Sequence, residues 1–143
     1  MFSFFLSKNQ KLVKQWKKEH QQLVALAHKI IKAYEEGDDK ATKKELLALK
    51  SLAMNHLMME DIELYRLLKD KGQLDKDAQK LALEFKNSFR GTKTALMEFL
   101  TASTRNDAVL DEKFFETFNA IVGILAERIA FEEENLYTNL ASS

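Results

Sequence analysis

Five polar side chains interrupt the apolar stripes of the sequence, and their types suit either metal binding or buried ion pairing. They stand where a helical spacing of three and four residues otherwise places apolar groups, and they are His20, His56, Glu60, Arg128 and Glu132. A buried charge without a partner costs several kcal/mol, so these groups must satisfy one another, a metal ion or water. The residues alone leave two arrangements open. One is a network in which Arg128 pairs with Glu132 and Glu60 beside two hydrogen-bonded histidines, and the other is a metal or ligand site in a bundle core.

The elements that must position these side chains are four long helices. Gly37 and Gly72 each combine a helix-stopping glycine with an Asp that can cap the next helix, and Asp111 is the expected cap of the last one. The spacing predicts helices over residues 8–36, 40–71, 76–103 and 112–140. Long helices joined by short loops predict an all-α fold, an antiparallel up-down-up-down four-helix bundle. The five polar side chains lie near the middle of their helices, so we expect them to converge on one buried cluster.

Composition narrows the class of protein. The chain of 143 residues is long enough to bury a core without stabilisation by disulfides. We expect one domain over 1–143 with residues 1–7 as an apolar cap. The formal net charge is zero, which argues against nucleic-acid binding. Without Cys there are no disulfides or thiolate sites.

No apolar run approaches the roughly 20 residues that span a bilayer, and the segment 1–7 is too short for a signal peptide. We therefore expect a cytoplasmic protein without a membrane partner.

Four segments together resemble the hemerythrin-like (HHE) domain, a four-helix bundle that holds two irons. They are Glu19-His20-Gln-Gln-Leu23, Ala33-Tyr-Glu-Glu-Gly-Asp38, His56-Leu-Met-Met-Glu60-Asp-Ile-Glu-Leu-Tyr65 and Arg128-Ile-Ala-Phe-Glu132-Glu-Glu-Asn-Leu-Tyr137. The most specific part is the His-x-x-x-Glu step followed by an acidic residue and Leu-Tyr. The resemblance covers nearly the whole chain and implies a hemerythrin-like fold.

The resemblance also implies a ligand set that is only partly retained. The retained positions are His20, His56, Glu60 and Glu132, and the two glutamates match the carboxylates that bridge the irons. Phe85 and Phe89 stand where the family has two helix C histidines, and Arg128 stands where it has a helix D histidine. In the family these three histidines serve one iron. A normal di-iron, oxygen-carrying centre is therefore not expected.

Two cofactor states remain open for such a core. One is a site for a single metal with two histidines and two carboxylates, which suits Fe(II), Zn or Mn. The other is a metal-free bundle in which Arg128 neutralises Glu60 and Glu132 while Phe85 and Phe89 fill the vacated pocket. We therefore expect either no cofactor or one iron or similar divalent ion.

A second, weaker resemblance indicates a protein partner. Three segments are similar to the bacterial regulator-of-sigma-D family of anti-sigma factors, namely Leu12-Val-Lys-Gln-Trp16, Lys71-Gly-Gln-Leu74 and Leu125-Ala-Glu-Arg-Ile-Ala-Phe-Glu-Glu133. Members of that family bind a sigma factor of RNA polymerase. No Ser-His-acid set, phosphate loop or Cys nucleophile is evident, so an enzyme is not expected. The expected function is that of a non-enzymatic binding or regulatory protein, a monomer or weak dimer, and the alternative is a metal-binding sensor.

Overall fold

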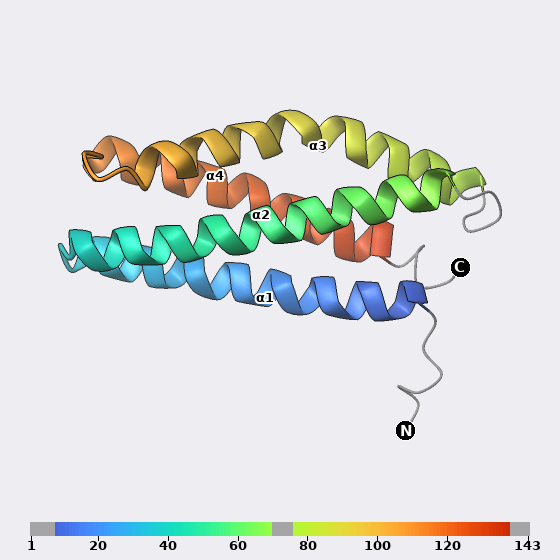
Figure 1. Ribbon diagram of the computed structural model, residues 1–143, viewed down its shortest axis with the longest axis horizontal. Coiled ribbons are helices and arrows are strands. Elements are labelled where there is room, and N and C mark those ends of the chain that lie inside the picture. The colour runs from blue at the N-terminus through green and yellow to red at the C-terminus, as the bar shows by residue number, and fades with distance from the viewer. Residues whose placement is uncertain (1–7, 70–75, 138–143) are drawn as a thin grey trace, which may run out of the picture.

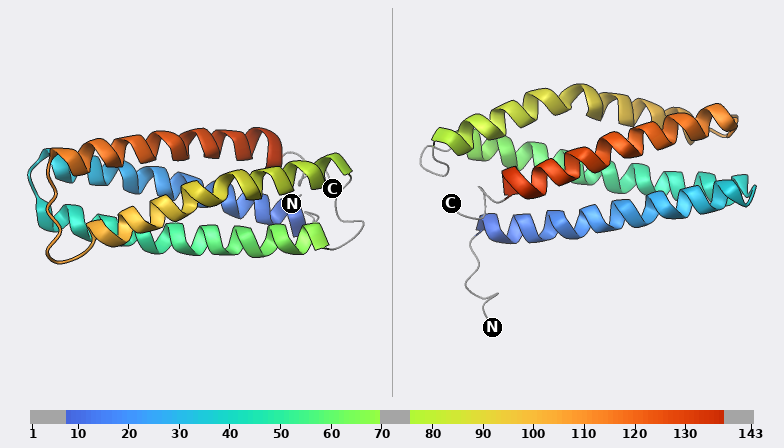
Figure 2. Two further views of the ribbon diagram at one scale, coloured as in Figure 1. Left: turned by 90° about the horizontal axis from the view of Figure 1, so that it is seen from above. Right: turned by 180° about the vertical axis from the view of Figure 1, so that it is seen from behind.

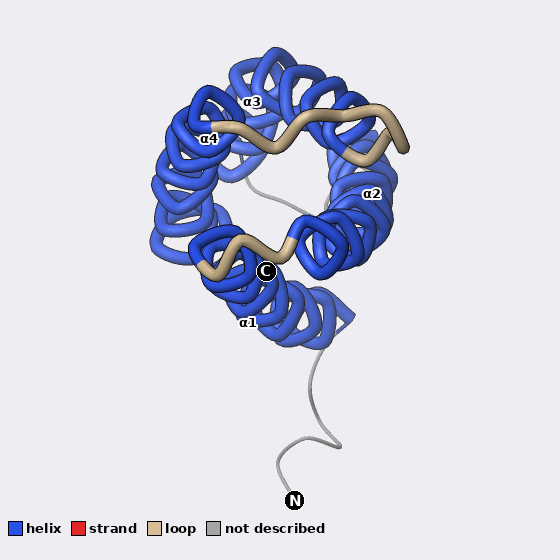
Figure 3. The backbone as a smooth tube through the Cα atoms, turned by 90° about the vertical axis from the view of Figure 1, so that its left-hand side faces the viewer, coloured by secondary structure: helices blue, strands red, loops and turns tan. Residues whose placement is uncertain are grey.

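The computed structural model describes residues 8–69 and 76–137, and all regular structure in these ranges is helical. The elements are α1 (Lys8–Glu35), α2 (Asp39–Lys69), α3 (Lys76–Ser103), α4 (Glu112–Phe131) and a short π-helix, η2 (Glu132–Leu136). The helices run antiparallel, and the loops 36–38 and 104–111 lie at the same end of the bundle (Figures 1 and 2). Seen along its length, the bundle is a ring in which each helix lies beside the next (Figure 3). The predicted all-α four-helix bundle is confirmed.

Local chemistry explains where the described helices break. Gly37 adopts a φ of 74°, a conformation that an L side chain disfavours, and its N–H donates to the Tyr34 carbonyl at 2.9 Å. The carboxylate of Asp38 then accepts from the Ala41 N–H at 3.0 Å, and that of Asp111 accepts from the Phe114 N–H at 2.9 Å. Two of the three predicted breaks are therefore confirmed. The break at Gly72 and the segment 1–7 lie outside the described residues.

Stacked aromatic rings hold together the end of the bundle where these loops lie. The rings of Tyr34 and Phe115 stack with centroids 4.2 Å apart, and those of Phe99 and Phe114 stack at 5.6 Å. Because these rings come from α1, α3 and α4, the contacts join three helices through apolar packing alone. Residues of α2 that follow a helical spacing of three and four are also buried, and they are Leu46, Leu49, Ala53, His56 and Glu60.

The last helix differs from the single α-helix predicted over 112–140. The α-helix ends at Phe131, and in the π-helix that follows the N–H of Tyr137 donates to the carbonyl of Glu132, five residues earlier. In a regular α-helix, side chains five apart point about 140° away from each other. The wider turn brings Glu132 and Tyr137 to the same interior face, where Tyr137 is 0% exposed. A regular α-helical spacing of four residues would instead continue the buried face from Glu132 to Leu136.

Within the described ranges, no helix combines the length and apolar character needed to cross a membrane. This finding bears on α1 to α4 alone.

We predict that Gly123→Ala stabilises the protein. Gly123 is exposed within α4, and an added Cβ would meet nothing within 4 Å. Urea unfolding followed by circular dichroism should show a free energy of unfolding higher by up to about 1 kcal/mol, because Ala loses less backbone entropy in a helix. The control Gly37→Ala adds the same methyl group at positive φ and should lower that free energy by about 1 kcal/mol. A destabilised Gly123→Ala would show that α4 requires the glycine.

Candidate metal centre

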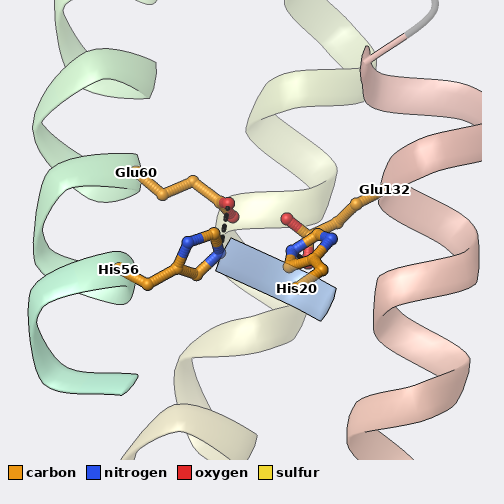
Figure 4. A group of neighbouring side chains, drawn as sticks. All are labelled: His20, His56, Glu60 and Glu132. Atoms are coloured by element: carbon orange, nitrogen blue, oxygen red, sulfur yellow. Dashed lines mark ion pairs between the residues drawn. The ribbon is translucent and has the colours of Figure 1, made fainter. Parts of the chain in front are cut away.

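Four side chains that the sequence singled out meet in the interior between α1, α2 and η2 (Figure 4). They are His20, His56, Glu60 and Glu132, each 2–3% exposed. Each offers one ligand atom, and the four atoms lie within 4.8 Å of one another. His56 and Glu60 share a face of α2 because they are four residues apart. The arrangement gathers two imidazole nitrogens and two carboxylate oxygens around one point.

Two further carboxylates orient the histidine rings. Nδ1 of His56 lies 2.7 Å from a carboxylate oxygen of Glu19, and Nδ1 of His20 lies 3.2 Å from one of Glu133. A carboxylate only accepts, so Nδ1 donates in each pair, and in a neutral ring Nε2 keeps its lone pair for the centre. This carboxylate–histidine arrangement is typical of histidines that bind metals. Nothing in the sequence distinguishes Glu19 and Glu133 from its many other acidic residues as partners of the histidines.

Tyr137 is a seventh residue at the centre, and its burial did not follow from the helical spacing of the sequence. Its hydroxyl oxygen lies 2.9 Å from Oε2 of Glu60, 3.0 Å from Oε2 of Glu132 and 3.2 Å from Nε2 of His20. Its ring stacks on that of His20 at a centroid distance of 5.5 Å. A hydroxyl carries one hydrogen and can donate to one of these acceptors at a time. The centre therefore holds more acceptors than donors.

The pKa values of the two buried glutamates are shifted in opposite directions. Burial, and then the charge of Glu60, raise the pKa of Glu132 well above the ordinary value for a carboxyl. Burial also acts to raise the pKa of Glu60, but its interactions with His56, Glu132 and Tyr137 outweigh burial and lower it. The two carboxyl pKa values are therefore shifted in opposite directions, as expected for two acids that share a buried site.

The two histidines also differ. Burial and the neighbouring His56 lower the pKa of His20. Burial acts in the same direction on His56, but the carboxylates of Glu60 and Glu19 outweigh it and raise the pKa of His56. The surroundings thus raise the pKa of both His56 and Glu132, which favours protons on these two groups beside the charge of Glu60. Burial and the charges of both glutamates raise the pKa of Tyr137 above its usual value.

The donor set fits a metal cation. Nε2 of His56 is buried and has no hydrogen-bond partner, although it lies 3.1 Å from Oε2 of Glu60, because the geometry is not that of a hydrogen bond. A buried polar atom left without a partner is costly. A cation at the centre would bind Nε2 of His56 through its lone pair and would balance the charge of the carboxylates beside it.

An apolar pocket of about 280 Å³ adjoins the centre. His20, His56 and Glu132 line it together with aliphatic side chains such as Leu57, Leu96 and Leu125. Arg128 also lines this pocket and is partly buried, but it is not one of the four converging ligands. Phe85 and Phe89 lie in α3, and their side chains are outside the described part of the structure.

Fold and donor set together define a four-helix bundle with a His/Glu group that could hold a metal. The family description that matches residues 11–140 is that of the hemerythrin HHE cation binding domain. The chain therefore belongs to the hemerythrin HHE family, which confirms the main resemblance. No curated protein and no solved structure is significantly similar to the chain. The match gives no support to the resemblance to the regulator-of-sigma-D family, which stays a prediction.

We predict that Glu132→Gln stabilises the metal-free protein at neutral pH. The folded-state pKa of Glu132 is raised above its unfolded value, so its contribution to stability is complete below the unfolded value and is lost as pH rises through the folded pKa. Gln keeps a hydrogen-bonding group without a charge, and its gain at neutral pH should be about 1–2 kcal/mol. The gain should disappear in acid, where the glutamate is protonated in both states.

Urea unfolding of chelator-treated protein at a series of pH values measures this difference. The control is Glu134→Gln, which makes the same change at an exposed position of η2 and should alter stability by less than about 0.5 kcal/mol. If wild type and Glu132→Gln had the same stability at every pH, the raised pKa of Glu132 would be wrong.

Proposed function

We propose that this domain binds a single metal ion, iron(II) or a similar divalent ion, through His20, His56, Glu60 and Glu132. The observation that carries the proposal is the convergence of four buried ligand atoms within 4.8 Å. Carboxylates on the far nitrogens of both histidines support it, because they fix the rings with Nε2 toward the centre. Two imidazoles with carboxylates suit Fe(II), Zn and Mn.

The proposal specifies one ion because the described ligands surround one point. Across residues 8–69 and 76–137, His20, His56, Glu60 and Glu132 are the group found with ligand atoms close enough for a metal. The family's second set of histidines is replaced in the sequence by Phe85, Phe89 and Arg128. These three residues offer no ligand that commonly binds iron.

We propose a sensing or binding role for the loaded domain, without catalysis. A bound iron would supply a redox-active ion whose state can change with its surroundings. The chain's own residues would hold and insulate it: Glu19 and Glu133 orient the histidines, and the burial of the four ligands limits access of bulk water. Such an insulated site suits detection of iron or of oxidation.

We predict one metal per chain. Protein purified without a His-tag and loaded with Fe(II) under anaerobic conditions should contain one iron by elemental analysis and should unfold at a higher temperature than metal-free protein. His56→Ala should lose the iron, and Glu19→Gln should bind it about 10–100-fold more weakly. The control His28→Ala removes the remaining histidine, which is exposed, and should bind iron normally. Two irons per chain would refute the single site, and none would refute metal binding.

An exposed apolar stripe on α2 favours a second candidate function, the binding of a protein partner. Leu47, Met54, Met58 and Ile62 are each 48–53% exposed. Their spacing of seven, four and four residues places them on one face of α2, opposite His56. Exposed Met-rich surfaces are common at protein-binding sites. We propose that this face binds a second copy of the chain, and a sigma factor is the other partner to test.

We predict that Met58→Lys abolishes this association. Sedimentation velocity at rising concentration should show a monomer–dimer equilibrium for the wild type and a monomer for the variant, because a charge in an apolar contact must be desolvated. Val109→Lys changes an exposed apolar residue of the 104–111 loop instead and should dimerise like wild type. A monomeric wild type at every concentration would exclude self-association, and a mixture with purified sigma factor then tests the other partner.

A further inference from the structure

The geometry points to the phenol oxygen of Tyr137 as a fifth ligand of the metal ion, one that favours iron(III). This inference rests on the metal site proposed above and extends it by one residue and one oxidation state.

The distances from the phenol oxygen of Tyr137 to its neighbours are those expected between ligands of one metal ion. Neighbouring ligands about 2.1 Å from one metal at right angles lie about 3.0 Å from each other. The phenol oxygen lies 2.9 Å from Glu60, 3.0 Å from Glu132 and 3.2 Å from Nε2 of His20, each measured to an atom that faces the centre. Glu19 and Glu133, in contrast, contact the Nδ1 atoms on the outer side of the rings.

If a metal is present, hydrogen bonds cannot satisfy all three contacts that the phenol oxygen makes with Glu60, Glu132 and His20. The phenol has one hydrogen, whereas both glutamates would be ionised acceptors and Nε2 of His20 would already be a ligand. At least one carboxylate oxygen would then face the phenol oxygen about 3 Å away without a hydrogen between them. Coordination of all three oxygens by one cation removes that repulsion.

The backbone and the ring contacts fix Tyr137 in this place. The π-helical turn puts Glu132 and Tyr137 on the same face although they are five residues apart. The phenol ring is stacked on His20 with an interplanar angle of 15°, and it also packs against Trp16 at a centroid distance of 5.5 Å. Because Tyr137 is fully buried, its oxygen has no alternative partner in bulk water.

Coordination changes the charge of the site. The O–H bond of Tyr137 breaks, an oxygen–metal bond forms, and the proton is released to solvent. The phenolate adds a third negative charge to those of Glu60 and Glu132. Three anionic ligands balance a trivalent ion, so Tyr137 favours iron(III) over iron(II) and over zinc.

The spectrum of the oxidised iron protein tests the inference. Protein loaded with Fe(II) without oxygen is treated with one equivalent of ferricyanide, which takes one electron from each iron and becomes ferrocyanide. A phenolate bound to iron(III) gives a visible charge-transfer band, and resonance Raman excitation in that band enhances tyrosine ring vibrations. We expect both signals in the wild type. Tyr137→Phe should lose them while keeping one iron per chain, with a more positive reduction potential.

Two control variants test whether the charge-transfer band comes from Tyr137. The chain has three tyrosines, and both Tyr34→Phe and Tyr65→Phe should keep the band. These two variants also identify Tyr137 by elimination if Tyr137→Phe does not fold. A wild type that holds one iron without the band, or a band that persists in folded Tyr137→Phe, would overturn the fifth ligand and leave the metal site standing. A wild type that holds no iron would overturn both.

Discussion

The close approach of two buried carboxyl groups, on Glu60 and Glu132, is the constraint on which the rest of this core depends. Two ionised carboxylates cannot share a buried site without a cation, because their repulsion adds to the cost of removing each from water. In the metal-free protein the surroundings raise the pKa of Glu132 and that of His56, which favours protons on these two groups beside Glu60. A cation held by the same side chains would balance the carboxylates instead, so the contacts that destabilise the metal-free core would favour the cation.

The opposite part of the bundle allows such a core to persist. Around the 36–38 and 104–111 loops, α1, α3 and α4 are joined by stacked rings that include Tyr34, Phe99 and Phe114, and no charge has to be buried for those contacts. Apolar packing is insensitive to pH, whereas the polar centre consists of titratable groups that could also hold a metal. The end of the bundle near the two loops therefore contributes stability, whereas the polar centre carries the cost of its buried carboxyl groups.

Prediction from sequence worked where a residue's environment follows from its own helix. His56 and Glu60 stood out because α2 is regular and buries every third or fourth residue, and the breaks at Gly37 and Asp111 follow from local turn chemistry. Tyr137 was missed because a π-turn, which has no local signature in Glu-Glu-Glu-Asn-Leu, shifts the register by one residue. Glu19 was missed because its role requires His56, 37 residues away, and only the packing of α1 on α2 brings them together.

Helix α2 links the two functions proposed for the domain. Its inner face carries His56 and Glu60, and over the same turns its outer face carries Met54 and Met58. An ion held by two residues of α2 and by residues of α1 and η2 would restrict how α2 moves relative to those elements. If a partner binds the metal-loaded form of α2 more tightly, then by linkage it must tighten metal binding by the same factor. The shared helix therefore provides a physical route by which metal occupancy would control association, and this route needs no contact between the metal and the partner.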